Sequence, residues 1–67
     1  MKVIVNNKEK IVPIGCTVEM LAQIISIKSN EPVAIAIGEQ IIEREDWKTV
    51  RLNDRDTVTI IKATCGG

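Results

Sequence analysis

The chain has 67 residues, a mass of 7.4 kDa and a formal net charge of zero, from nine basic and nine acidic side chains. A chain this short forms a single domain that buries only roughly 60% of its unfolded surface. The balanced charge, without a basic cluster or aromatic platform, argues against nucleic acid as a partner, and no apolar run approaches the roughly 20 residues that cross a bilayer.

The first residues predict a β-hairpin. Met1 to Asn6 alternates, with Val3 and Val5 on one face and Ile4 on the other, which is typical of a strand. Asn6-Asn7-Lys8 tolerates a tight turn. Glu9 to Ile14 resumes an extended pattern, in which Pro13 indicates an edge strand or a strand end.

A helix is expected next. The hydroxyl of Thr17 is placed to accept a hydrogen bond from an unpaired amide of the first turn, and Glu19 suits the positive end of the helix dipole. The helix is expected to end near Lys28. Its apolar side recurs at helical spacing and predicts packing against a sheet; its members are Val18, Leu21, Ala22 and Ile25, widened by Met20, Ile24 and Ile27.

The second half predicts strands joined by turns. Residues 29–32 form a loop because the position before Pro32 disfavours helix. Val33 to Ile37 then alternates as a strand, with the two alanines opposite the larger side chains. The remaining segments are a turn at Gly38-Glu39, a short segment Gln40 to Ile42, a charged connector from Glu43 to Lys48, a turn at Asn53-Asp54-Arg55-Asp56 and a last strand from Thr57 to Lys62.

This order of elements predicts an α+β fold in which one helix lies across a mixed sheet of four or five strands. With a right-handed crossover, the first and last strands lie side by side in the centre of the sheet. Residues 1–62 are expected to form the domain, and residues 63–67 are expected to form a flexible C-terminal tail that ends in Gly66-Gly67.

Several segments, taken in this order, resemble the ubiquitin-like (β-grasp) sulfur-carrier proteins. The resemblance is closest to the thiamin-biosynthesis (ThiS-type) carriers, extends to the molybdopterin-synthase small subunit (MoaD-type), and covers essentially the whole chain. The matching segments are Met1-Lys2-Val3-Ile4-Val5-Asn6, Thr17-Val18 with Leu21, Ile37-Gly38-Glu39-Gln40-Ile41-Ile42 running into Arg44 and Trp47, the turn Asn53-Asp54-Arg55-Asp56, and Gly66-Gly67. Two positions depart from the family pattern: Arg55 stands where glycine is common, and Cys65 precedes the diglycine.

The resemblance implies that this chain is a carrier protein that does not itself catalyse a reaction. A ubiquitin-activating-like adenylyltransferase, which holds ATP and Mg, would adenylate the Gly67 carboxylate, and a sulfur-donor protein would convert the product to a thiocarboxylate. Thiazole synthase, or an equivalent acceptor, would then take the sulfur. The chain itself is expected to bind no cofactor and no metal, since it has no phosphate-cradling glycine loop and no histidine.

The diglycine suits this chemistry on physical grounds. A terminal carboxyl has a reference pKa of about 3.3–3.7 and is ionised at neutral pH. Two residues without a Cβ can thread a narrow channel. Because ordering the tail costs free energy, contacts elsewhere have to supply affinity. The expected docking patch leads along the last strand into the tail; its members are Ile4, Thr59, Ile61, Ala63, Thr64 and Cys65. The alternative is that these are ordinary scattered apolar residues on the surface.

Three other functions fit the same pattern. The carrier could deliver sulfur to molybdopterin or another product. It could be a protein modifier joined to lysines through Gly67, which predicts conjugates of higher mass. It could also be a passive β-grasp binding module, which would work without Gly66 and Gly67.

The remaining chemically notable residues have plain structural interpretations. Cys16 is expected to be a small buried hydrophobe, and Trp47 is expected to pack over the core, with a partner contact shared with Arg44 as the alternative. Cys65 could form a transient disulfide or attack an activated acyl group. Without a signal-peptide pattern, and with two cysteines too few for a disulfide scaffold, the protein is expected to be cytoplasmic with reduced thiols.

Overall fold

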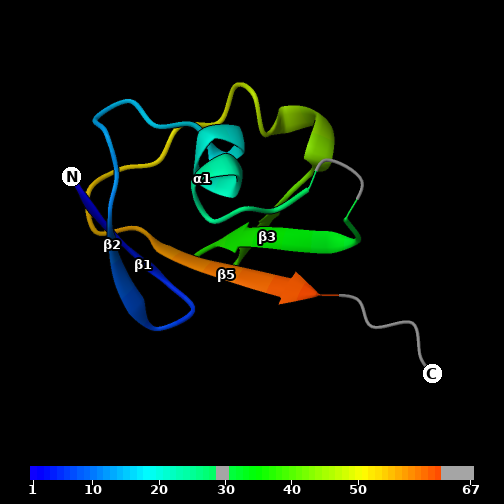
Figure 1. The fold of residues 1–67 in the computed structure, drawn as a ribbon, viewed down its shortest axis with the longest axis horizontal. Coiled ribbons are helices and arrows are strands. Elements are labelled where there is room, and N and C mark those ends of the chain that lie inside the picture. The colour runs from blue at the N-terminus through cyan, green and yellow to red at the C-terminus, as the bar shows by residue number, and fades with distance from the viewer. Residues whose placement is uncertain (29–30, 63–67) are drawn as a thin grey trace.

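The computed structural model describes residues 1–28 and 31–62, and in this part of the chain one α-helix packs against one face of a mixed sheet (Figure 1). The sheet has five strands in the order β2-β1-β5-β3-β4. Strands β1 and β5 are parallel neighbours, and the other neighbouring pairs are antiparallel. This arrangement confirms the predicted β-grasp fold and the central position of the first and last strands. The elements are β1 (Lys2–Val5), β2 (Lys8–Ile11), α1 (Val18–Ile24), β3 (Val33–Ile37), β4 (Gln40–Ile42), a 3-10 turn (Arg44–Asp46) and β5 (Thr57–Lys62).

The opening hairpin is confirmed. Val3 is fully buried and Val5 nearly so, while Ile4 points to the other face and is half-buried. Asn6 and Asn7 both have positive φ angles, 49° and 70°, which asparagine tolerates and which match the twist of a two-residue hairpin turn. Strand β2 lies at the sheet edge, which is one of the two interpretations that Pro13 allowed, and it ends at Ile11 and not at Ile14.

The predicted N-terminus of the helix is confirmed, but its predicted end is wrong. The hydroxyl of Thr17 accepts a hydrogen bond from the amide of Met20 at 3.2 Å. Helix α1 stops at Ile24 because Ser26 adopts a φ of 65°. The amide of Ile27 then donates to the carbonyl of Ala22 at 2.8 Å, and the amide of Ser26 donates to that of Gln23 at 3.1 Å. These two bonds form a Schellman motif, which closes the helix four residues before the expected position.

The buried side of the helix is narrower than the sequence indicates. Val18, Leu21 and Ala22 are buried, and Ile25 and Ile27 pack partly against the core. Met20 and Ile24, which were expected to widen this side, are 41% and 43% exposed. The short helix therefore contributes only about two turns to the core, and these two apolar side chains remain on the surface.

The predicted second half is confirmed in outline. In β3, Ile35 is fully buried, and Val33 and Ile37 pack against the core on the same face. The turn before β5 is closed by the Asp56 amide, which donates to the Asn53 carbonyl at 3.1 Å. Arg55 there has a φ of 68°, which explains why glycine would suit this position.

The core is aliphatic, with one aromatic side chain at its margin. Its largest fully buried side chains are Leu21, Ile35, Val3, Val18, Val58 and Cys16. Trp47 is buried, as expected, and its indole N–H donates to the carbonyl of Ile42 at 3.1 Å. Cys16 is also buried, as expected, and burial raises the pKa of its thiol.

Candidate functional site

The residues expected to carry the chemistry, Gly66 and Gly67, lie outside the described residues, as do Ala63, Thr64 and Cys65 of the expected docking patch. The predicted boundary between the domain and its tail, after residue 62, therefore stays a prediction. The structure does describe what precedes them, which is strand β5 and the sheet face on which its alternate side chains lie.

Strand β5 is held from both sides. Its pairing with β3 continues to the last residue of the strand, where Lys62 lies opposite Val33. Its pairing with β1 is shorter and covers Thr57 and Val58. Strand β5 is therefore a central strand that is paired on both flanks at its start and with β3 along its whole length.

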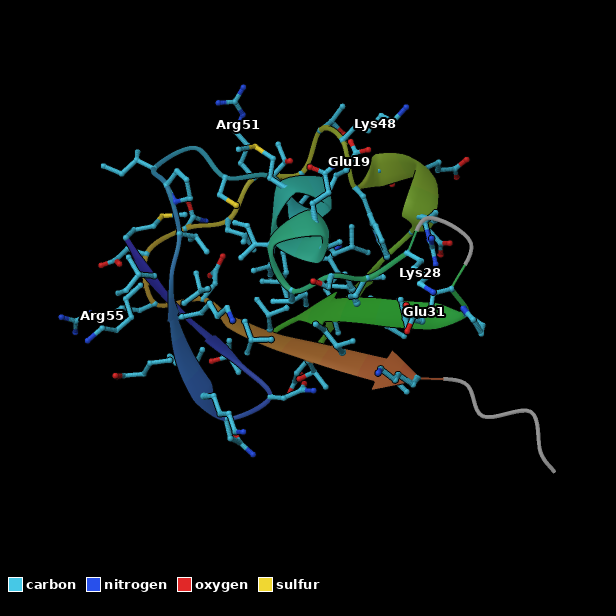
Figure 2. All side chains as sticks on the ribbon, in the orientation of Figure 1. Glu19, Lys28, Glu31, Lys48, Arg51 and Arg55 are labelled. Atoms are coloured by element: carbon cyan, nitrogen blue, oxygen red, sulfur yellow. The ribbon has the colours of Figure 1, made fainter. Side chains whose placement is uncertain are left out.

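Polar contacts surround the end of β5. The ammonium group of Lys62 lies 3.9 Å from a carboxylate oxygen of Glu31, and the Lys28 amide donates to the other oxygen of that carboxylate at 3.1 Å. Figure 2 shows Lys28 and Glu31 together beside this end of the sheet. The Lys62 side chain is 70% exposed, so this ion pair contributes little to stability.

Arg44 ties the connector to the start of β3. Its guanidinium donates to the carbonyl of Glu31 at 2.6 Å and to that of Val33 at 3.4 Å. The same group lies 4.2 Å from the centre of the Trp47 ring, a cation–π contact. The structure therefore gives Arg44 and Trp47 a role in holding the domain together, which is the packing interpretation expected for Trp47.

The described members of the expected docking patch share the sheet face opposite the helix. Ile61 is 50% exposed, Thr59 is exposed and Ile4 is half-buried. The strand register places Ala34 beside Ile61 and Ala36 beside Thr59.

Strand β4 extends the same face, because Ile41, 60% exposed, lies opposite Ala36. This face therefore has further apolar members beside the predicted ones, and we call the set the outer-face patch; its described members are Ile4, Ala34, Ile41, Thr59 and Ile61, together with Ala36, which is buried at 7% exposure. Sequence reasoning missed its β3 and β4 members, although the alternation in residues 33–37 already set the alanines opposite the core.

Within residues 1–28 and 31–62, no group of three or more His, Cys, Asp or Glu side chains is arranged to hold a metal ion. The same residues include no helix long and apolar enough to cross a membrane.

Comparisons with known proteins connect this geometry to one family. The model of the ThiS family matches residues 2–67. The crystal structure of the thiamine biosynthesis protein ThiS from Geobacter metallireducens is similar over 100% of both chains, with a TM-score of 0.84 and 25% sequence identity. A solution NMR structure of a thiamine biosynthesis protein from the same organism is similar over 100% of this chain and 88% of that one, with a TM-score of 0.80 and 25% identity. The comparison with curated proteins gave no match.

Proposed function

Since the chain belongs to the ThiS family, we propose that it is the sulfur carrier of thiamin biosynthesis and that it works through the carboxylate of Gly67. The observation that carries this proposal is the family match over residues 2–67, which includes the diglycine. The β-grasp body supports it, because β5 is a central strand that leads directly into those residues.

The proposed chemistry has two steps. An oxygen of the Gly67 carboxylate attacks the α-phosphate of ATP on a ubiquitin-activating-like adenylyltransferase, which forms an acyl-adenylate and releases pyrophosphate. A sulfur-donor protein then supplies sulfide sulfur to the acyl carbon, AMP leaves, and a thiocarboxylate remains. Thiazole synthase is the proposed acceptor of that sulfur. ATP and Mg bind to the adenylyltransferase, so this chain is a protein substrate.

The diglycine and the outer-face patch have separate tasks in this proposal. Ordering each backbone residue of the tail in the partner's channel costs about 1–2 kcal/mol. The outer-face patch offsets this cost by burying apolar surface, of which half-exposed Ile61 is the member nearest the tail. Five residues span at most about 18 Å when fully extended, so the partner's reaction centre has to lie within that distance of Lys62.

Removal of the diglycine tests the proposal. We expect a chain that ends at Cys65 to support no ATP–pyrophosphate exchange by the cognate activating enzyme, while the 67-residue chain supports it in proportion to its concentration. The truncated chain should unfold at the same temperature as the full chain, because the buried core lies within the described residues before Lys62.

Equal exchange with the full and truncated chains would overturn the proposal and would favour a passive binding module. Exchange that occurs with the full chain alone, followed by attachment to lysines, would favour a protein modifier.

A further inference from the structure

Strand β1 stops pairing with β5 well before β5 ends. Its register contains two pairs, Ile4 with Thr57 and Val5 with Val58. The chain then enters the hairpin turn, where Asn6 has a φ of 49° and Asn7 a φ of 70°. The main chain of β1 therefore leaves β5 while four residues of that strand remain.

The side chain of Asn6 continues the hydrogen bonding to β5 after the main chain of β1 has stopped pairing with that strand. The Asn6 amide still makes a regular ladder bond, to the Val58 carbonyl at 3.0 Å. If β1 continued, the carbonyl of residue 6 would accept from the Ile60 amide, and the amide of residue 8 would donate to the Ile60 carbonyl. In this structure the Ile60 amide donates to Asn6 Oδ1 at 2.8 Å, and Asn6 Nδ2 donates to the Ile60 carbonyl at 3.4 Å.

Few other side chains can make this replacement. A carboxamide has the same acceptor and donor as a peptide group, whereas a carboxylate only accepts and glycine offers neither. Asparagine also tolerates the left-handed backbone that the turn requires. Asn7, which follows in the same turn, makes no side-chain hydrogen bond to another described residue and so provides an internal comparison.

The bond to Asn6 completes the support of β5 on its second flank. On one side, β3 pairs with β5 as far as Lys62. On the other side, Asn6 is the contact that reaches Ile60, beyond the two backbone pairs with β1. Without it, β5 after Val58 would be held from one side and could swing about its pairing with β3.

We propose that Asn6 is a positioning residue, whose carboxamide fixes the end of β5 and so the direction in which the chain leaves the sheet toward the partner's reaction centre. This inference rests on the proposed function for its consequence in the reaction. A β5 end that can take several directions must be ordered when the partner binds. Loss of the Asn6 contact adds this ordering cost to binding and not to the chemical step. KM for the carrier should therefore rise while kcat stays constant.

Hydrogen exchange tests the contact without any partner. Asn6→Gly keeps a residue that favours positive φ and removes both side-chain bonds, while Asn7→Gly makes the same change one position later. Because one lost hydrogen bond is worth about 0.5–1.5 kcal/mol, we expect the protection factor of the Ile60 amide to fall about twofold to twelvefold in Asn6→Gly. Asn7→Gly should leave it within twofold, as should the protection of Val58 in both variants.

Kinetics with the cognate activating enzyme tests the consequence. In carrier-dependent ATP–pyrophosphate exchange, we expect Asn6→Gly to raise KM several-fold with kcat within twofold of the wild type. Asn6→Asp keeps the acceptor for Ile60 and should give a smaller rise. Asn7→Gly should change neither constant. If Asn6→Gly does not fold at the assay temperature, Asn6→Asp decides the question with the same two measurements.

Each result has a distinct meaning. Unchanged Ile60 protection in Asn6→Gly would overturn the contact, and reduced protection with unchanged KM would overturn the positioning role. A loss in kcat without a rise in KM would also overturn it. If the wild-type chain supports no exchange, the proposed function fails and the positioning role fails with it, even where the Ile60 amide behaves as expected.

Discussion

Replacing Ile61 with serine tests whether the outer-face patch docks the activating enzyme. Ile61 is 50% exposed, so a partner that covers the patch buries the exposed half of this side chain. Full burial of an isoleucine side chain is worth about 1.5–3 kcal/mol, and half of that is about 0.8–1.5 kcal/mol. We therefore expect Ile61→Ser to raise KM for the carrier by about fourfold to twelvefold.

The assay is ATP–pyrophosphate exchange at increasing carrier concentration, with the cognate activating enzyme held constant. The chain offers a matched control in Ile24, which is 43% exposed but lies on the helix and not on the outer face. Ile24→Ser makes the same chemical change at a similar exposure and should leave KM within twofold. Thermal unfolding of both variants establishes that the folded fraction at the assay temperature is unchanged.

Equal effects of Ile61→Ser and Ile24→Ser on KM would refute the reasoning, because they would reflect general destabilisation or nonspecific contact. An unchanged KM in Ile61→Ser would show that the partner docks elsewhere. A fall in kcat alone would place Ile61 at the reaction and not at a docking surface.

Three further predictions concern stability. Thr17→Ala removes the hydrogen bond that the Thr17 hydroxyl accepts from the Met20 amide. In urea titrations it should lower the free energy of unfolding by about 1 kcal/mol. An unchanged free energy would mean that this helix cap contributes nothing to stability. Arg55 has a φ of 68°, a left-handed conformation that costs a residue other than glycine about 1–2 kcal/mol. Arg55→Gly removes this backbone strain and should raise the unfolding temperature. A lower unfolding temperature would contradict this. Burial raises the pKa of the Cys16 thiol above its ordinary 9.0. The thiol of the unfolded chain therefore loses its proton at a lower pH than the thiol of the folded chain, so the folded state should lose stability as the pH rises above 9.0. Cys16→Ala should lack this contribution to the pH dependence, and an identical slope in both proteins would refute the assignment.

Much of the fold could be predicted because local signals agreed with the final packing. The alternation of Val3 and Val5 set the buried face of β1, and the Thr17 hydroxyl marked the start of the helix. The end of the helix was missed because Ser26 closes it in a conformation for which glycine is the usual signal. The apolar pattern continued past that point, so periodicity alone extended the helix to Lys28.

The candidate site was only partly predictable for a related reason. The side-chain positions of Ile4, Thr59 and Ile61 follow from strand alternation, so their common face could be predicted. The addition of Ile41 required the order of the strands, which brings β4 beside β3. The bonds of Asn6 to Ile60 join residues 54 positions apart and depend on where β1 ends, which no local pattern shows.

The central claim is that the carboxylate of Gly67 accepts sulfur, and intact mass spectrometry with fragmentation tests it most directly. The chain is incubated with ATP, Mg, the cognate activating enzyme and a sulfur source, with a reaction lacking ATP as the control. We expect the mass change of one oxygen exchanged for sulfur, confined to the fragment that contains Gly66 and Gly67 and absent without ATP. A chain of unchanged mass in the complete reaction, or a sulfur atom located on Cys16 or Cys65, would contradict the proposed function.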